Sequence, residues 1–373
     1  MVSSVRAGFV AALAFGCSQS SPHADRVFVS QAGSSTVAII DTGTGEIERR
    51  IDVGMLPHNL LLSADGSSLY VALVGSQAVA ELDTATGHLR RTMLTGPVPD
   101  SRPDGTRIQP HFDQDAFSHT TCYGCHRPGG AQPKYAGDRP FGLLLSPDGK
   151  RLLVSHLRSA AIAVLDLEAG SVERTVHLEK AGQATEAVAL ARLGSEIWVA
   201  MRAPQPSSSA GVVRRLDAGT LEPLGDVTTG SDPASLLALP NRGRVLVSNF
   251  ETDSVTELDQ EGIARPHAAA PGPLGLLALP SGDVLVADYY SNAVSFLDLG
   301  RETSETVTLE YAGVLYVNPT HGALASDRRS AWLVASGTDG HLLQLDLASR
   351  RVVQQVPIDG LSFGVAVIPG VPW

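Results

Sequence analysis

The stretch PFGLLLSPDGKRLLVSHLRSAAIAVLDLEAG, from Pro140 to Gly170, decides the fold class. It contains three short apolar segments, FGLLLS, RLLVSH and IAVLD, with a Pro-Asp-Gly turn signal between the first and the second. Short apolar segments bounded by Pro, Gly and Asp are typical of β-strands joined by tight turns. The third segment ends in Asp166, and this ending identifies further copies of the unit along the chain.

Seven segments share this ending. They are VAIID, VAELD, IAVLD, VRRLD, VTELD, VSFLD and LLQLD, which end at Asp41, Asp83, Asp166, Asp217, Asp259, Asp298 and Asp346. Successive aspartates are 39 to 51 residues apart, except for one gap of 83 residues. Short strands repeated at a period of about 40 residues indicate a β-propeller. The predicted fold class is all-β: a seven-bladed β-propeller of four-stranded blades, with strand A innermost and strand D outermost.

Both ends of the chain are predicted to contribute to blade 1. The first repeat begins at RVFVSQ, which corresponds to strand B, so its strand A is missing from the N-terminal side. The segment FGVAVIPG, which ends at Gly370, has the pattern of a strand A and follows the last repeat. Pairing of these two segments would close blade 1 and remove an open sheet edge, which otherwise invites aggregation.

The repeat resembles that of the YVTN family of seven-bladed propellers, whose unit reads PxGVAVSPDGxxxYVxNxxxxTVSVID. Pro140 to Gly170 is the most similar copy, and the resemblance covers Asp25 to Gly370 except for one insertion. It implies a propeller domain over residues 25–370. It does not imply an activity, because propellers host many unrelated functions.

The charge of the chain argues against some partners. It has 39 Asp and Glu against 28 Lys and Arg, a formal charge of −11. Nucleic acids and anionic membranes attract basic patches, so neither is an expected partner of this acidic chain. A membrane is expected to be involved only through a lipid anchor.

The N-terminal segment predicts export. Arg6 precedes the apolar run AGFVAALAFG, from Ala7 to Gly16, which is too short to span a bilayer as a helix. LAFGC resembles the lipobox of bacterial lipoproteins and implies lipidation of Cys17. The alternative is an ordinary cleaved signal peptide. Residues 1–24 are therefore expected to be a signal peptide and tether, and the location to be the periplasm or a bacterial outer-membrane or cell surface.

The long gap between repeats contains an insertion with cysteines. Pro97 to Arg139 separates blade 2 from blade 3 and contains Cys122, Cys125 and His126 in the pattern C-x-x-C-H. This is the pattern of c-type haem attachment, in which each thiol adds to a haem vinyl group and the histidine binds the iron. One covalent haem c is therefore expected in residues 97–139, with His126 as the proximal ligand.

Other chemistry remains open for these residues. A disulfide between Cys122 and Cys125 suits an oxidising compartment but leaves His126 without a role. A zinc site needs further ligands, which His111 and His119 offer. The pattern can also occur by chance.

The sequence around the motif, FDQDAFSHTTCYGCHRPGG from Phe112 to Gly130, resembles the haem segments of bacterial di-haem cytochrome c peroxidases and related propeller proteins. The resemblance implies thioether bonds at Cys122 and Cys125 and iron ligation by His126. Those peroxidases have two such motifs, each in a cytochrome c fold. This chain has one motif and no such domain, so the resemblance does not imply peroxidase activity.

Aligned repeats predict which residues line one mouth of the propeller channel. The residues that start strands A are His58, Phe141, Glu186, Ala234, Leu274, His321 and Phe363. Those that end strands B are Gln31, Leu73, His156, Met201, Asn249, Asp288 and Ser336. The insertion joins a strand D to a strand A, a connection expected at this same mouth.

Several residues of this mouth are candidates for chemistry near the haem. The candidate catalytic residues are His58, His156, Glu186 and His321, because neutral imidazoles and carboxylates ligate metals and carry protons. The candidates for the distal iron ligand are His111, His119, His58 and His156, with Met93 a weaker one. A purely structural role in the turns and an open sixth iron position both remain possible. His23, His88, His177, His267 and His341 are predicted to be surface residues.

Three functions fit these predictions. The first is an exported mono-haem c-type cytochrome on a propeller scaffold, which exchanges electrons with a redox partner protein or assists a periplasmic redox enzyme. The second is a propeller oxidoreductase that acts on a small substrate at the channel mouth. The third is a surface-anchored binding propeller without haem.

Overall fold

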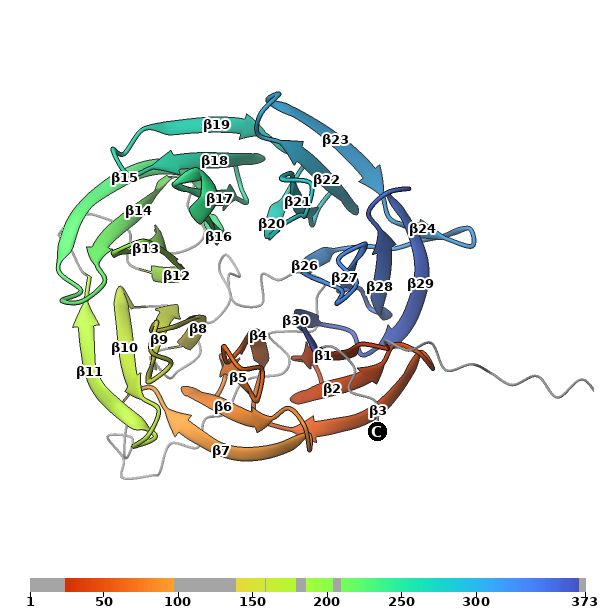
Figure 1. The fold of residues 1–373 in the computed structure, drawn as a ribbon, viewed down its shortest axis with the longest axis horizontal. Helices are drawn as coiled ribbons and strands as arrows, with labels where there is room; N and C mark the ends of the chain where they lie inside the picture. The colour runs from red at the N-terminus through yellow and green to blue at the C-terminus, as the bar shows by residue number, and fades with distance from the viewer. Residues whose placement is uncertain (1–23, 97–138, 158, 179–185, 204–208, 369–373) are drawn as a thin grey trace, which may run out of the picture.

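A computed structural model of the protein describes residues 24–96, 139–157, 159–178, 186–203 and 209–368. Seven four-stranded antiparallel sheets form a ring around a central axis (Figure 1). The prediction of an all-β, seven-bladed propeller with four-stranded blades is confirmed. In the described segments, no helix is both long and apolar enough to cross a bilayer.

Blades 1 to 4 each have four strands, in the following order from the axis outward. Blade 1 consists of β30 (Ser362–Ile368), β1 (Arg26–Gln31), β2 (Thr36–Asp41) and β3 (Glu46–Asp52). Blade 2 consists of β4 (Pro57–Leu62), β5 (Ser68–Leu73), β6 (Ala78–Asp83) and β7 (His88–Leu94). Blade 3 consists of β8 (Arg139–Leu145), β9 (Arg151–Leu157), β10 (Ala161–Asp166) and β11 (Ser171–His177). Blade 4 consists of β12 (Glu186–Leu193), β13 (Glu196–Arg202), β14 (Ala210–Asp217) and β15 (Pro223–Ser231).

Blades 5 to 7 follow the same order. Blade 5 consists of β16 (Pro233–Leu239), β17 (Arg244–Asn249), β18 (Ser254–Asp259) and β19 (Ala264–Ala268). Blade 6 consists of β20 (Pro273–Ala278), β21 (Val284–Asp288), β22 (Ala293–Asp298) and β23 (Thr303–Thr308). Blade 7 consists of β26 (Pro319–Leu324), β27 (Ser330–Ala335), β28 (Gly340–Asp346) and β29 (Arg351–Ile358). A hairpin outside the predicted repeat, β24 (Glu310–Tyr311) and β25 (Val314–Leu315), comes between blades 6 and 7 in sequence.

The first sheet contains strands from distant parts of the chain. β30 pairs antiparallel with β1, with Val27 opposite Val367 and Val29 opposite Val365. The two strands lie side by side next to the axis in Figure 1. This pairing gives blade 1 the same four strands as the other blades.

The apolar cores lie between neighbouring blades. Side chains of β1 alternate between two of them: Val27 and Val29 pack with Trp332 of blade 7, whereas Phe28 packs with Leu69 of blade 2. Both faces of a middle strand are therefore buried, which explains why the B and C segments of the sequence are almost continuously apolar. Strands D lie at the rim, and β3 and β7 leave most side chains at least partly exposed.

The innermost strands approach one another at backbone distance. A Cβ atom at Gly275 of β20 would lie 2.3 Å from the carbonyl oxygen of Thr320 on β26. A Cβ atom at Gly364 of β30 would lie 2.4 Å from the carbonyl oxygen of His58 on β4. Real Cβ atoms do not come this close to backbone oxygens, so glycine at these positions sets the spacing of adjacent blades around the channel.

Buried hydroxyl groups connect the same strands. The Ser30 hydroxyl donates to the carbonyl oxygen of His58 at 2.5 Å and accepts from the backbone N–H of Gly364 at 2.8 Å. In blade 5, the Ser248 hydroxyl donates to the carbonyl oxygen of Leu274 in blade 6 at 2.7 Å. Each of these serines on a strand B therefore satisfies inner backbone groups that the strand A pairing leaves free, and it joins two blades.

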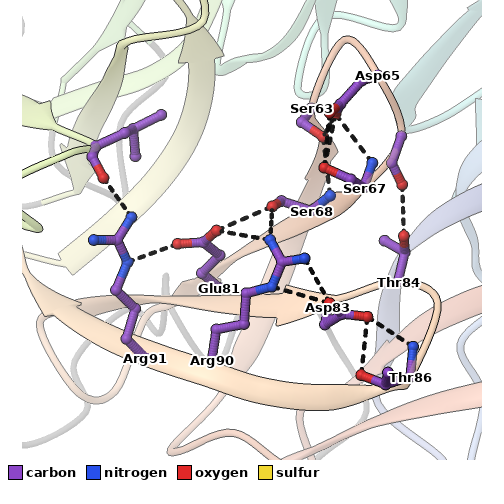
Figure 2. Close-up of polar contacts among 12 residues, drawn as sticks. Ser63, Asp65, Ser67, Ser68, Glu81, Asp83, Thr84, Thr86, Arg90 and Arg91 are labelled. Atoms are coloured by element: carbon purple, nitrogen blue, oxygen red, sulfur yellow. Dashed lines mark hydrogen bonds and ion pairs between the residues drawn. The ribbon is translucent and has the colours of Figure 1, made fainter.

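The recurrent aspartate at the end of strand C closes the turn to strand D. Asp83 Oδ1 accepts from the backbone N–H of Thr86 at 2.7 Å and from its hydroxyl at 2.9 Å, and Arg90 binds the other carboxylate oxygen (Figure 2). These contacts lower the pKa of Asp83. Backbone N–H groups of the following turn also bind the equivalent aspartates, Asp41, Asp166, Asp217, Asp259, Asp298 and Asp346. The sequence signature is thus a turn cap repeated in all seven blades.

Replacing Gly275 with alanine should destabilise the ring. The added methyl group would meet a backbone carbonyl that cannot rotate away, so we expect a loss of about 1–3 kcal/mol in the free energy of unfolding. Gly225→Ala is the matched control, because a Cβ atom at Gly225 would meet no atom within 4 Å. Urea unfolding measures both variants. Equal midpoints for the two would contradict the close-approach account.

Removing residues 362–373 deletes β30 and exposes the edge of β1. We expect the shortened chain to aggregate or to lose its cooperative thermal transition, because an unpaired inner edge of blade 1 would replace a hydrogen-bonded one. Removal of residues 369–373 alone is the control, because it leaves β30 in place. Circular dichroism during heating, combined with size-exclusion chromatography, measures the effect. A chain without β30 that melts like the full chain would contradict this prediction.

Candidate functional site

The strands bring most of the predicted mouth residues to one side of the ring. Strands A begin and strands B end on this side, which we call the mouth. β7 also ends on this side, because Leu94 pairs with Ala78, the first residue of β6. β8 begins there with Arg139, which pairs with Leu157 at the end of β9. Residues 97–138 therefore connect two strand ends that both lie at the mouth.

The haem-motif residues and two distal-ligand candidates are outside the described part of the chain. They are Cys122, Cys125, His126, His111 and His119. Cys17 and His23 also lie outside it. The predictions about these residues stay predictions.

One sector of the mouth is a wall of aromatic rings from consecutive inner strands. The His58 ring of β4 stacks on Phe363 of β30, with ring centroids 4.1 Å apart and planes 16° apart. Phe141 of β8 packs on it at 4.5 Å. His321 of β26 meets it edge to face, with centroids 6.3 Å apart. The repeat therefore places equivalent residues of blades 7, 1, 2 and 3 in contact.

Both histidines of this wall are held neutral. Burial and the nearby His321 lower the pKa of His58 to about 3, although a contact between its Nδ1 and Asn59 acts in the opposite direction. Burial lowers the pKa of His321 to about 4, against a hydrogen bond to the Phe363 backbone. Burial in this wall would cost a charged imidazolium more hydration free energy than its remaining contacts return. Neither ring therefore takes up a proton near neutral pH.

Two further candidates are buried. His156, near the end of β9, is 0% exposed and lies opposite Pro140. Met93 of β7 is 1% exposed and packs in the core between blades 2 and 3. Access to either side chain from the mouth would require the surrounding strands to separate.

Blades 4 and 5 contain a buried charge cluster. The Arg202 guanidinium binds Glu186 at 2.9 Å and Asp232 at 2.7 Å, and all three side chains are less than 10% exposed. Glu186 is a predicted catalytic residue, but its carboxylate forms an ion pair with Arg202. Arg202 and Asp232 are not among the predicted mouth residues, although Arg202 follows Met201 directly and Asp232 precedes Ala234 by two residues. Such a cluster ties two blades together, at a substantial desolvation cost.

Asp288 of β21 is a second buried carboxylate at the mouth. It is 0% exposed. Its Oδ2 accepts from the Ser295 hydroxyl at 2.6 Å, while its Oδ1 has no hydrogen-bond partner among the described residues. Burial raises the pKa of Asp288 to about 7, because the charged carboxylate loses hydration that one hydroxyl does not replace.

One surface prediction is wrong. His267 of β19 is only 8% exposed, and its Nε2 lies 3.4 Å from a carboxylate oxygen of Glu257. It faces inward because it pairs with Val255 on the adjacent strand C, on the buried side of an otherwise exposed rim strand. His88 and His177 are exposed as predicted. His341 is partly buried and packs against Tyr316, with ring centroids 5.0 Å apart.

The mouth thus has two chemically different sectors. Blades 7, 1, 2 and 3 present neutral imidazole and phenyl rings, whereas blades 4, 5 and 6 present buried carboxylates. Among the described residues, no three His, Cys, Asp or Glu side chains converge on a possible metal position.

Comparison with known proteins shows the fold. No protein-family model and no curated protein matches the chain. Among solved structures, hydrazine synthase of Kuenenia stuttgartiensis is similar with a TM-score of 0.62 and 14% identity, over 94% of this chain and 99% of that one. A functionally unknown protein of Desulfotomaculum acetoxidans has a TM-score of 0.65 and 14% identity, over 92% and 98%. Virginiamycin B lyase of Staphylococcus aureus has a TM-score of 0.56 and 12% identity, over 81% and 84%.

These likenesses support a propeller scaffold and carry no activity to this chain, because their identities are so low. The resemblance to the YVTN family stays a prediction. Function has to be argued from the residues of this chain.

Replacing Asp288 with asparagine should stabilise the protein at alkaline pH. The pKa of Asp288 is about 7 in the folded chain, against 3.8 for an unperturbed aspartate, so the unfolded chain ionises first. The wild type therefore loses stability as pH rises from about 4 to about 7, whereas the neutral amide loses none. We expect Asp288→Asn to be more stable at pH 8 by on the order of 2–4 kcal/mol and similar at pH 4.

Asp298→Asn is the control for this prediction, because Asp298 is a turn cap whose pKa is lowered. It should not stabilise the chain at pH 8. Urea unfolding at both pH values measures the two variants. An Asp288→Asn variant that is less stable than the wild type at pH 8 would show that the buried carboxylate is charged and paired.

Proposed function

We propose that this protein is an exported mono-haem c-type cytochrome on a propeller scaffold. It would exchange electrons with a redox partner protein or act as the accessory of a periplasmic redox enzyme. The observation that carries the proposal is the C-x-x-C-H sequence at Cys122, Cys125 and His126, within the long insertion between β7 and β8.

The donor set of the insertion fits haem c. Two thiols separated by two residues match two vinyl groups of one macrocycle, and the next residue supplies an imidazole for the iron. When bound, haem supplies a one-electron redox centre. Cys122 and Cys125 would hold it covalently, and His126 would be the proximal ligand. The ends of β7 and β8 at the mouth support a position of the haem on that side of the propeller.

For the second axial position, the burial of the described candidates favours ligands in the insertion. His58 packs against Phe141 and Phe363, and His156 has no exposed surface. Either residue would reach an iron atom only if the inner strands separated. We therefore favour His111 or His119 over His58 and His156, and an open position is the alternative.

Export and anchoring are part of the same proposal. Haem attachment to such motifs in bacteria takes place outside the cytoplasm, so the N-terminal signal and the motif support each other. Lipidation of Cys17 would keep the propeller at a membrane surface. The net charge of −11 supports a protein rather than a nucleic acid as the partner.

A small-substrate oxidoreductase is the second candidate function. The neutral rings of His58 and His321 favour it, since each keeps one ring nitrogen without a partner among the described residues. Pairing of Glu186 with Arg202 and the complete burial of His156 weigh against those two residues as substrate contacts. If the purified protein carried no haem, the third candidate function, a surface-anchored binding propeller, would be the conclusion.

The test is the mass of the exported protein. Full-length chain made in cells that mature c-type cytochromes should carry one haem, which adds about 600 Da to the intact mass after denaturation. Cys122→Ala and Cys125→Ala should lose one thioether each and retain much less haem. His126→Ala should retain covalent haem but change the absorption spectrum of the iron, since it keeps both thiols and lacks only the ligand.

Cys17→Ala is the matched control, because it removes a cysteine outside the motif and should leave the haem mass unchanged. A zinc site would instead add about a tenth of the haem mass under native conditions. A disulfide would lower the mass by two hydrogens. Either result in the wild type, without haem, would overturn the cytochrome proposal.

A further inference from the structure

A cavity of about 400 Å³ lies between blades 6 and 7, on the side of the ring opposite the mouth. Three turns surround it: the β20–β21 turn of blade 6, and the β26–β27 and β28–β29 turns of blade 7. Strands A and C both begin at the mouth, so the turns that follow them lie on the opposite side. A cavity of this volume has room for a small organic molecule.

The apolar part of the lining is anchored in the core between the two blades. Leu279 and Phe296 come from blade 6, and Leu347 comes from blade 7. Leu279 and Phe296 belong to the apolar core of these blades, and Leu347 packs against it. The core therefore fixes the apolar surface that a ligand would meet in this cavity.

Three arginines, Arg328, Arg329 and Arg350, line the same cavity. The guanidinium group of Arg350 lies over the ring of Phe296, 4.3 Å from its centroid, and forms an ion pair with Glu305. Arg328 and Arg329 are exposed, and neither side chain has an ion-pair or hydrogen-bond partner among the described residues. These two guanidinium groups can therefore bind a ligand, and a carboxylate fits the fork of a guanidinium group in a bidentate manner.

The backbone of Arg328 adopts a conformation for which other blades use glycine. Its N–H donates to the carbonyl oxygen of Ala325 at 2.9 Å and closes the A–B turn. The same bond closes this turn in blades 2, 3, 5 and 6 at Gly66, Gly149, Gly243 and Gly282. The angle φ is 55° at Arg328 and 61° to 92° at these glycines, a region in which a side chain strains the backbone. Glycine would serve the turn better, so the side chain of Arg328 is explained by a role outside the turn.

Two aspartates also line the cavity, and both bind groups of their own turns. Asp346 Oδ1 accepts from the Ser349 N–H at 2.7 Å and from the Ser349 hydroxyl at 2.6 Å. Asp283 Oδ2 accepts from the Ser281 hydroxyl at 3.1 Å. The lining thus carries three guanidinium groups against two carboxylates, in a chain with a formal charge of −11. This local excess of positive charge favours an anion as the ligand.

We propose that the cavity between blades 6 and 7 binds a small organic anion with an apolar body. The apolar body would contact Leu279 and Leu347, and the anionic group would pair with Arg328 and Arg329. The site includes no residue of the mouth or of the C-x-x-C-H segment, so it is independent of whether the protein carries haem.

The test uses the purified full-length chain with 2-naphthoate as the probe and the neutral 2-naphthamide as its comparison. NMR titration should show one 2-naphthoate per chain, with a dissociation constant of about 1 mM or lower. The amide should bind at least about tenfold more weakly, because it lacks the charge that the guanidinium groups bind. Arg328→Gly and Arg329→Gln should each weaken binding of 2-naphthoate by at least about tenfold.

The Arg328→Gly variant separates binding from folding. It restores the glycine of the equivalent turns, so the midpoint of its urea unfolding should be equal to or higher than that of the wild type. A loss of binding together with a lower midpoint would show that Arg328 serves the fold, and would overturn its role as a ligand.

Arg301→Gln is the matched control. Arg301 lies in the β22–β23 turn on the same side of the ring, with a side chain that is 83% exposed, and it pairs with Asp298 outside the cavity lining. This variant should bind 2-naphthoate like the wild type. The absence of saturable binding, equal binding of the amide, or unchanged binding by Arg328→Gly would overturn the proposal. Inorganic phosphate that binds as tightly as 2-naphthoate would overturn the requirement for an apolar body.

Discussion

The architecture depends on the backbone contact between successive inner strands. Gly275 and Gly364 each face a carbonyl oxygen of the next blade at a distance that excludes any side chain, and serines such as Ser30 join the same strands through their hydroxyl groups. Gly142 makes the same kind of contact with the Val188 carbonyl oxygen, so three pairs of neighbouring blades are held at backbone distance around the channel. The interblade apolar cores then fill the space outside this inner ring.

The same constraint determines the chemistry of the mouth. Strands held this close bring equivalent positions of neighbouring repeats into direct contact, so His58 packs on Phe363 and Phe141 instead of facing open solvent. Burial then favours the neutral form of the two imidazoles. Elsewhere at the mouth, Arg202 forms ion pairs with the two buried carboxylates of Glu186 and Asp232. The inner wall is consequently closely packed at these positions.

The fold was predictable because the repeat encodes local chemistry. Aspartates such as Asp83 cap the turn that follows them, so the ending of strand C is visible in the sequence. Glu186 and Arg202 are cross-strand partners in blade 4, but Asp232 lies between β15 and β16, so the repeat pattern did not show the complete cluster. His267 lies on a rim strand with little apolar pattern, which conceals its inward direction. Gly313, which has a positive φ in the turn between β24 and β25, was a usable signal for that hairpin.

The central functional claim is covalent attachment of haem to the insertion. The most direct measurement is extraction of the purified, exported protein with acidified acetone, followed by an alkaline pyridine spectrum of both fractions. Haem held by thioether bonds stays with the polypeptide, whereas haem held only by an iron ligand dissolves in the acetone. We predict a haemochrome spectrum in the protein fraction, at one haem per chain. Haem in the acetone fraction, or in neither fraction, would contradict covalent attachment.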